Sequence, residues 1–294
     1  MTRIYEAFQL VGTSQSATAT VEDQPVPESV FNTKAPEPPL GRDGIDFDAI
    51  PRHQWNPVAE SLVTLARRGA CVEQFRRLRS RISAFRDEFP LKTILICSGM
   101  PEEGKTFVAA NLAQSLGRNG NKRVLLIDGD LRRPRLHDVL GAPAAPGLSE
   151  YLAGTANPAE VMQRDVSFKP AETAGAGGLS TLTFIPAGKC GDNNSELAAN
   201  HRIEELIKRL SPHFDWIIID ASPVLVVPDA VDLARAADAV LLIARAGVTR
   251  FEEAQRTQAS FGSSRILGVV LNAVRGAPRK DYYYHYYGSE NTGA

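Results

Sequence analysis

The sequence is poor in cysteine and has no long apolar run. Its three cysteines, Cys71, Cys97 and Cys190, stand far apart, without the Cys-x-x-Cys spacing of zinc sites or the pattern of a disulfide framework. No apolar run approaches the ~18 residues of a membrane-spanning helix, and no basic region followed by an apolar stretch opens the chain. We therefore expect reduced, structural cysteines in a cytoplasmic protein that does not cross a membrane.

An excess of charge of one sign is also missing. The chain has 33 basic and 34 acidic side chains, which leaves a formal net charge of −1. Composition therefore gives no overall electrostatic footprint for nucleic acid, and we expect no nucleic-acid partner. What the chain does have is 294 residues, of which 43% are hydrophobic. This is enough for the core of one domain of ordinary size, with residues left over.

Composition divides the chain into three parts. Residues 1–60 are rich in Ser, Thr, Pro and acids, which predicts a disordered tether, and residues 1–11 fit either a frayed tail or a short docking helix. Apolar periodicity over residues 61–275 predicts one folded domain. Residues 276–294 are predicted to form a flexible tail with five of the seven tyrosines: Tyr282, Tyr283, Tyr284, Tyr286 and Tyr287.

The folded part contains a phosphate-binding motif in its expected setting. A β-branched apolar run at residues 93–96 predicts a strand, and apolar residues at helical spacing follow the loop. Between them, Gly99, Gly104, Lys105 and Thr106 match G-x-x-x-x-G-K-[ST]. In this motif backbone N–H groups hold phosphate oxygens, Lys105 reaches the β- and γ-phosphates, and the Thr106 hydroxyl binds Mg²⁺. We therefore predict ATP and Mg²⁺ as ligands.

Two further apolar segments, each predicted to be a strand, are followed by acidic residues. Residues 123–127 lead to Asp128 and Asp130, and residues 215–219 lead to Asp220 in a Walker B arrangement. In parallel α/β sheets these strand ends face the same crevice as the phosphate loop. Because carboxylates repel phosphates, acids in that crevice imply an intervening cation. We therefore expect Asp128 and Asp220 to hold Mg²⁺ with Thr106, and Asp128 and Asp130 to accept a proton.

The remaining elements complete an α/β pattern. Strands are predicted at 181–186, 239–244 and 265–271, with helices between them and a further helix from about Ser195. The predicted fold is that of a P-loop NTPase, with a mostly parallel central sheet flanked by helices on both faces. Asn272 ends the last strand, where its carboxamide fits either contact with a nucleotide base or a turn.

A helix predicted over residues 70–89 has an arginine-rich outer face. That face carries Arg76, Arg77, Arg79, Arg81 and Arg86. From these residues alone the helix is a solvated surface element, and the Glu73–Arg76 pair contributes only ~0.2–0.5 kcal/mol.

Taken together, the P-loop, the segments LLIDGDLR and IIIDASP and the tyrosine-rich end closely resemble the bacterial tyrosine autokinases of capsular and exopolysaccharide export. The resemblance covers residues 70–287 and implies that residues 61–275 are an ATP-dependent kinase domain. It implies Lys105, Asp128, Asp130 and Asp220 as catalytic residues and the tail tyrosines as autophosphorylation sites. It also implies a homo-oligomeric ring joined through Glu73, Arg76 and Arg79, which match E-x-x-R-x-x-R, and peripheral attachment to the membrane through a separate polysaccharide co-polymerase that activates the kinase.

Two departures from the family concern nucleotide binding. Many members have Gly where this chain has Glu102, which together with Glu103 places two negative charges beside the predicted phosphate site. Phe107 replaces a common second Ser or Thr and removes a hydroxyl from the α-phosphate site. The residues assigned to the nucleotide are Gly99, Glu103, Gly104, Lys105, Thr106, Phe107 and Asn272.

The alternative is an ATPase switch of the kind that partitions plasmids or places the division site. Such proteins carry a signature lysine five residues before the P-loop lysine. Here that position is Met100, which favours the kinase.

Overall fold

The structure, a computed structural model, describes residues 3–5, 46–66, 68–118, 122–167, 179, 181–189 and 202–274. The tyrosine cluster at 282–287 and the helix start predicted at Ser195 lie outside these residues, as does most of the predicted N-terminal tether. Among the described helices, none combines the length and the apolar character needed to cross a membrane.

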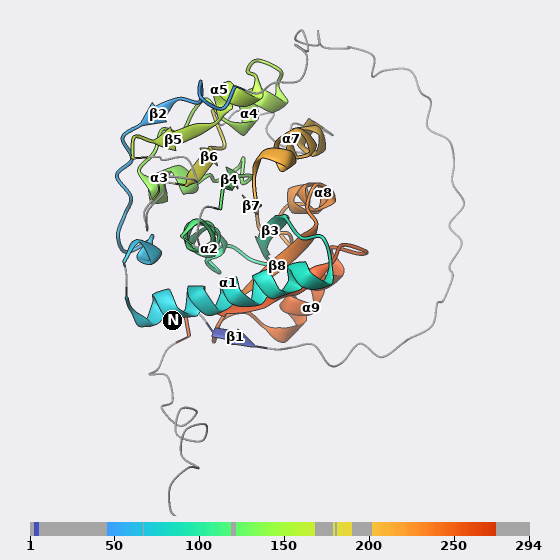
Figure 1. Cartoon of the computed structure of the whole chain (residues 1–294). Helices are drawn as coiled ribbons and strands as arrows, with labels where there is room; N and C mark the ends of the chain where they lie inside the picture. Colours follow the sequence, from blue (N-terminus) through green and yellow to red (C-terminus); the bar gives the residue numbers. More distant parts are fainter. Residues whose placement is uncertain are drawn as a thin grey trace, which may run out of the picture.

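A nine-stranded sheet forms the centre of the described chain (Figure 1). In sheet order its strands are β1 (Arg3–Tyr5), β9 (Ile266–Asn272), β8 (Ala239–Arg245), β3 (Thr93–Ser98), β7 (Trp216–Asp220), β4 (Val124–Asp128), β6 (Leu182–Ile185), β5 (Gln163–Asp165) and β2 (Arg52–His53). The strands from β9 to β6 run parallel, whereas β1 and β5 pair antiparallel with β9 and β6. The predicted mostly parallel α/β sheet is therefore confirmed.

The central strands are apolar on both faces because helices cover both faces. Every residue of β3, β4 and β7 is buried. Alternate side chains of β3 enter different cores: Ile94 and Ile96 join one, and Leu95 and Cys97 join the other. Burial on both faces is the usual condition of parallel strands, and it explains their continuous apolar runs.

Helices contribute to the two cores on opposite faces of the sheet, as Figure 1 shows for α2 and α8. One face is covered by α1 (Ala70–Glu88), α2 (Lys105–Gly117), α3 (Leu136–Leu140) and the 3-10 turn η1 (Val63–Leu65). The other is covered by α4 (Leu148–Leu152), α5 (Pro158–Val161), α7 (Arg202–Leu210) and α8 (Asp229–Arg235). In the described part of the chain, helix α9 (Phe251–Ala259) also precedes β9, and the turn η3 (Ser211–His213) precedes β7.

The N-terminal residues differ from the expectation. The helix considered for residues 1–11 is wrong at Arg3–Tyr5, which form β1 and pair with β9. A short isolated helix is marginal in water, whereas the edge of β9 offers unpaired backbone groups, and Ile4 and Tyr5 are residue types that favour strands.

Residues 46–60 also differ from a disordered tether. They contribute β2, and Ile50 and Trp55 are each only 3% exposed. The Trp55 amide donates a hydrogen bond of 2.8 Å to Asp165 Oδ2. The segment has few apolar residues, but Ile50 and Trp55 are buried, so the folded part begins before residue 61.

Candidate nucleotide-binding site

Three strand ends meet at the phosphate loop. The loop connects β3 to α2, and the β3–β7 and β7–β4 pairings align Ile96 with Asp220 and Asp220 with Asp128. The carboxyl ends of the three strands therefore lie side by side. The connection from β3 to β4 passes over one face of the sheet through α2, and the connection from β7 to β8 passes over the other face through α8. Open α/β sheets bind ligands at the carboxyl ends of strands where the connections leave to opposite faces in this way.

The phosphate loop requires a glycine immediately before α2. Gly104 has a φ of 93°, and a Cβ atom there would lie 2.0 Å from Asn272 Nδ2. The same Nδ2 donates a 3.0 Å hydrogen bond to the Glu103 carbonyl. Asn272 thus holds the loop in place from the end of β9, and its contact with a base stays a prediction.

The two glutamates of the loop have different roles. Glu103 is 2% exposed, and its carboxylate accepts hydrogen bonds from the Met100 amide at 2.8 Å and from the Thr249 hydroxyl. It braces the loop from within. Glu102 is exposed and has a φ of 63°, a left-handed conformation that favours glycine, and its carbonyl accepts a hydrogen bond from Arg245.

Lys105 is held beside the cleft by Asp130. Its Nζ lies 3.1 Å from Asp130 Oδ2, and the two side chains are only 14% and 4% exposed. Asp130 Oδ1 accepts further hydrogen bonds from Ser222 Oγ at 2.8 Å and from the Arg133 amide at 3.0 Å. Burial alone would lower the pKa of Lys105, but the charges of Asp220 and Asp130 outweigh burial and raise it. The ammonium group therefore remains charged at neutral pH.

Asp128 and Asp220 are fully buried next to each other. The Asp128 carboxylate accepts hydrogen bonds from the amides of Asp130 and Leu136, at 3.3 and 3.1 Å. Burial, followed by the charge of Asp220, raises the pKa of Asp128 well above its ordinary value. Burial raises the pKa of Asp220 to about 6, an effect that Lys105 only partly offsets.

Asp220 fits a cation site. Neither of its carboxylate oxygens makes a hydrogen bond of ordinary geometry within the described residues. A buried carboxylate without such partners is strongly disfavoured unless a cation lies beside it. Both Asp128 oxygens are engaged by amides, so Asp128 fits a supporting position better than a direct contact with the metal.

The site is not a complete protein cage for a metal. In the described part of the chain, no group of three or more His, Cys, Asp or Glu residues is arranged to hold one. Mg²⁺ at phosphate sites takes one or two carboxylates and fills its other positions with phosphate oxygens and waters. Asp220 and Thr106 therefore fit Mg²⁺ that is bound together with a nucleotide.

An open cleft of about 610 Å³ lies over the loop. Its lining includes Gly104, Lys105, Thr106, Asp130, Ser222, Val226 and the arginines Arg132, Arg133 and Arg135. Asp229 anchors Arg132 at 2.7 Å. Cationic side chains at the mouth and Lys105 at the base suit a polyanionic ligand.

Two residues assigned to the nucleotide have packing roles in this structure. Phe107 packs on α1, where its ring centroid lies 5.8 Å from that of Phe75. A Cβ atom at Gly99 would lie 2.2 Å from Thr257 Oγ1, so glycine there lets α9 approach the loop. Contact of either residue with a nucleotide stays a prediction.

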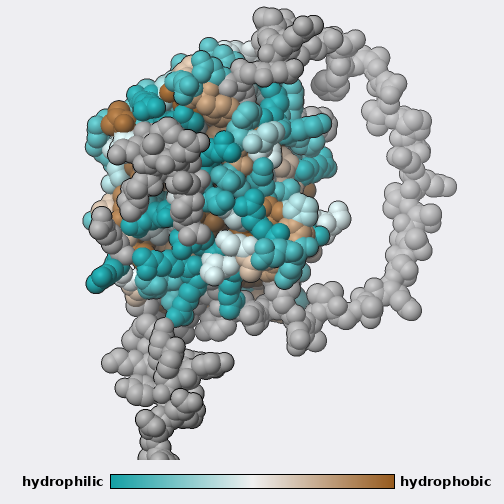
Figure 2. Space-filling view, viewed as in Figure 1, coloured by the Kyte–Doolittle hydropathy of each residue, from teal (hydrophilic) through white to brown (hydrophobic). Residues whose placement is uncertain are grey.

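The residues assigned to a ring contact occupy the outer and the inner sides of α1. Glu73 and Arg76 form a half-exposed pair at 2.6 Å. Arg79 instead turns inward and donates a 2.9 Å hydrogen bond to the Ser115 carbonyl of α2. Figure 2 shows that the exposed surface over α1 is mostly hydrophilic.

Sequence reasoning missed three residues that support the site. Ser222 bonds Asp130, Thr249 bonds Glu103, and Asp229 anchors Arg132. Ser222 stands two residues after Asp220, so its position after an acidic strand was a usable signal. Thr249 and Asp229 belong to no recognisable motif, and only the tertiary structure identifies them.

Comparisons with known proteins agree with this geometry. Residues 94–291 match the model of the CobQ/CobB/MinD/ParA nucleotide binding domain. The chain is 31% identical over 280 residues to the tyrosine-protein kinase wzc of Salmonella typhimurium, a match that covers 88% of this chain and 37% of that protein. It is 29% identical over 215 residues to the tyrosine-protein kinase YwqD of Bacillus subtilis, covering 72% of this chain and 85% of that one.

A solved structure extends the likeness to three dimensions. The kinase domain of the Escherichia coli tyrosine kinase ETK superposes with a TM-score of 0.63 at 28% identity, covering 77% of this chain and 86% of that domain. The chain spans little more than a third of the length of the Salmonella relative. These matches confirm the resemblance to bacterial tyrosine kinases that the sequence motifs predict.

Proposed function

Because the chain belongs to the family of the CobQ/CobB/MinD/ParA nucleotide binding domain, we propose that it is an ATP-dependent protein-tyrosine kinase that phosphorylates its own C-terminal tyrosines. The observation that carries this proposal is the position of Lys105 among Asp130, Asp128 and Asp220 at three adjacent strand ends. The names of the Salmonella and Bacillus relatives support the reaction type. Regulation of polysaccharide polymerisation and export is part of the proposal.

The nucleotide site uses residues from three elements. Loop amides and Lys105 contact the phosphates, and Asp220 and the Thr106 hydroxyl hold Mg²⁺. When bound, Mg²⁺ neutralises charge on the phosphate oxygens. Lys105 has a side chain that is only 14% exposed, so its fixed positive charge stabilises the transferring phosphoryl group more than it would in bulk solvent.

The two neighbouring acids, Asp128 and Asp130, differ in their access to the cleft, and this difference decides which of them can accept the tyrosine proton. A tyrosine hydroxyl has a reference pKa near 10, so a group within hydrogen-bond reach must take its proton during attack. Asp130 lines the cleft, whereas Asp128 is fully buried and bonded to two amides. Asp130 is therefore the proton acceptor, and Asp128 positions the Asp130 amide through its 3.3 Å hydrogen bond.

The proposed phosphate acceptors are Tyr282, Tyr283, Tyr284, Tyr286 and Tyr287. They follow Asn272, which holds the phosphate loop from the end of β9, by ten or more positions in the sequence. A segment of that length allows the tyrosines of one subunit to enter the cleft of another. The step forms a bond between the tyrosine oxygen and the γ-phosphorus, and ADP leaves.

Assembly and attachment complete the proposal. Glu73 and Arg76 lie on the exposed side of α1, where a neighbouring subunit of a ring can reach them. Arg79 supports that surface by tying α1 to the phosphate-loop helix α2. A separate membrane protein of the polysaccharide co-polymerase type recruits and activates the kinase.

One assay tests the reaction. The full chain is incubated with Mg²⁺ and ATP, and phosphotyrosine and free phosphate are measured together. A kinase gives phosphotyrosine on the tail peptide, whereas free phosphate without phosphotyrosine indicates an ATPase switch and contradicts the proposal. A chain with all five tail tyrosines changed to Phe is the control, because it keeps the cleft and loses the acceptors.

A mixing experiment tests transfer between subunits. A Lys105→Met chain with an intact tail is combined with an otherwise normal chain that lacks residues 276–294. The first lacks the phosphate-binding lysine and the second lacks acceptors, so phosphotyrosine on the Lys105→Met chain requires transfer in trans. Absence of phosphate from that chain excludes such transfer.

A further inference from the structure

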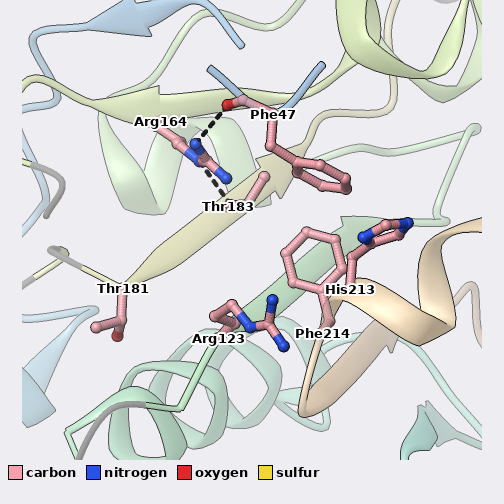
Figure 3. A pocket seen from close by; sticks show the side chains of 7 residues that line it. All are labelled: Phe47, Arg123, Arg164, Thr181, Thr183, His213 and Phe214. Atoms are coloured by element: carbon pink, nitrogen blue, oxygen red, sulfur yellow. Dashed lines mark hydrogen bonds between the residues drawn. The ribbon is translucent and has the colours of Figure 1, made fainter. Parts of the chain in front are cut away.

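A second pocket lies beside the amino ends of the parallel strands, away from the phosphate loop (Figure 3). Its volume is about 160 Å³. Arg123 and Phe214 come from the segments that precede β4 and β7, and Arg164 and Thr183 come from β5 and β6. Phe47 closes the pocket from the segment that precedes β2.

The buried wall of this pocket carries a guanidinium group next to a hydroxyl group. Arg164 is 8% exposed, and its Nε donates a 3.1 Å hydrogen bond to Thr183 Oγ1 while Nη1 donates a 2.8 Å bond to the Phe47 carbonyl. Burial, followed by the charge of Arg52, lowers the pKa of Arg164 to about 10, although Asp48 acts in the opposite direction. A cation in such surroundings gains from an added negative charge.

A second cation lies across the pocket from Arg164 (Figure 3). The Arg123 side chain is 54% exposed, and its Nε lies 3.8 Å from Asp215 Oδ2, a distance that leaves the pairing loose. Among the described residues, the pocket lining contains two arginines, a histidine and two threonines but no acid. Guanidinium and hydroxyl donors that line one pocket without an acid suit an oxyanion.

The remaining wall is aromatic. The Phe47 ring lies 4.5 Å from that of His213 and 5.9 Å from that of Phe214, measured between centroids. Burial and the charge of Arg123 lower the pKa of His213, which favours the neutral form of its ring. The aromatic wall therefore suits an apolar or flat group, whereas the side of the pocket with the arginines suits a negatively charged group.

We propose that this pocket binds a small organic oxyanion, a phosphate or carboxylate group attached to a short apolar or aromatic moiety. The anionic group lies between Arg164, Thr183 and Arg123, and the apolar part contacts Phe47 and Phe214. The site is separate from the nucleotide cleft, because Arg123 precedes β4 whereas Asp128 ends it, roughly 16 Å away along the strand. The proposal does not depend on kinase activity.

Calorimetric titration of the full chain tests the site. Saturating Mg²⁺ and ADP first fill the nucleotide cleft, so that added anions cannot bind there. The probes are phenylphosphonate, benzoate and the neutral benzyl alcohol. Saturable binding of phenylphosphonate or benzoate, without binding of benzyl alcohol, supports the proposal and shows which oxyanion fits better. Failure of both anions to bind overturns it, as does equal binding of benzyl alcohol.

Variants then locate the binding. Arg164→Lys is expected to weaken it roughly tenfold or more, because hydrogen bonds to charged groups contribute that much. Thr183→Val keeps the shape of the side chain on β6 but removes its hydroxyl group, and it replaces Arg164→Lys as the test if that variant does not fold. Arg123→Gln is compared with Arg235→Gln, since Arg235 is also a surface arginine, 62% exposed and 3.5 Å from an aspartate. Equal affinity of the Arg123→Gln and Arg235→Gln variants, or unchanged affinity in Thr183→Val, overturns the assignment.

Discussion

The buried charges near the two ends of the parallel strands differ in sign. At the carboxyl ends, Asp128 and Asp220 are buried around Lys105. At the amino ends, Arg123 and Arg164 face a small pocket without an acid among its described lining residues. The acids of the first arrangement attract a metal ion, which adds to Lys105 in binding phosphates, whereas the second arrangement attracts anions directly.

This difference shows how a nearly neutral chain can hold two strongly charged sites. The net charge of −1 gives no sign of either site, because a sum over the whole chain does not record where the buried acids and arginines lie. Asp128 and Arg123 stand only five positions apart in the chain, but they belong to different ends of β4.

The largest effect is expected from substituting Lys105, which begins α2 after the phosphate loop, compared with Lys92, which directly precedes β3. Lys105→Met removes the fixed charge beside the transferring phosphoryl group and should lower phosphotyrosine formation by roughly 10²–10³-fold. Lys92→Met, at the amino end of β3, removes a 2.7 Å hydrogen bond to the Ser211 carbonyl and should leave the rate within about twofold. Initial rates of phosphotyrosine formation provide the comparison. Equal losses in the two variants would contradict the separation of the two ends.

The next effect is on stability and depends on pH. The folded-state pKa of Asp220, about 6, exceeds its ordinary value of 3.8, so ionisation opposes folding above pH 6 and this effect fades as the pH falls toward 4. In the absence of nucleotide and metal, Asp220→Asn should raise the free energy of unfolding by about 2–3 kcal/mol at pH 7.5. The gain should vanish near pH 4. Urea unfolding at both pH values measures it, and a gain that does not change with pH would show that burial of the charge is not the cause.

A smaller effect is expected at the start of α2. Gly104→Ala should destabilise the protein by about 1–2 kcal/mol, because alanine is disfavoured at positive φ. It should also weaken nucleotide binding, since the new Cβ atom displaces Asn272 from the Glu103 carbonyl. The double variant Gly104→Ala/Asn272→Ala should recover part of the lost stability. Thermal unfolding measures both variants, and strictly additive losses would exclude the clash.

The smallest effect concerns Glu102. Its φ of 63° suits glycine, so Glu102→Gly should raise the free energy of unfolding by about 0.5–1 kcal/mol, after the greater freedom of glycine in the unfolded chain is subtracted. Glu102→Ala removes the same charge but keeps the unfavourable backbone geometry. A stabilisation by alanine equal to that by glycine would assign the effect to charge rather than to backbone conformation.

Those structural elements that depend on a local sequence pattern could be predicted from the sequence. The continuous apolar runs of β3, β4 and β7 predicted buried parallel strands because only strands covered on both faces can be apolar throughout. The phosphate loop was readable because its glycines and Lys105 have fixed spacing. The acids at the ends of β4 and β7 followed from the common direction of parallel strands.

The features that could not be predicted from the sequence depend on contacts between segments that are far apart in the chain. Ile4 and Tyr5 form an edge strand because β9 is there to pair with them, which no local pattern reveals. Glu103 looked like an added charge at the phosphates, but its partner Thr249 lies far along the chain. The pocket at Arg164 joins side chains from five separate segments, so its residues carry no spacing that a motif could describe.

The central claim is that the acidic ends of β4 and β7 form a nucleotide site that is completed by a metal ion. The most direct measurement is calorimetric titration with a non-hydrolysable ATP analogue, with and without Mg²⁺, on the normal chain and on Asp220→Asn. The account predicts that Mg²⁺ raises affinity by about tenfold or more in the normal chain and has little effect in the variant. Equal affinity with and without Mg²⁺ in the normal chain, or an undiminished gain in Asp220→Asn, would contradict it.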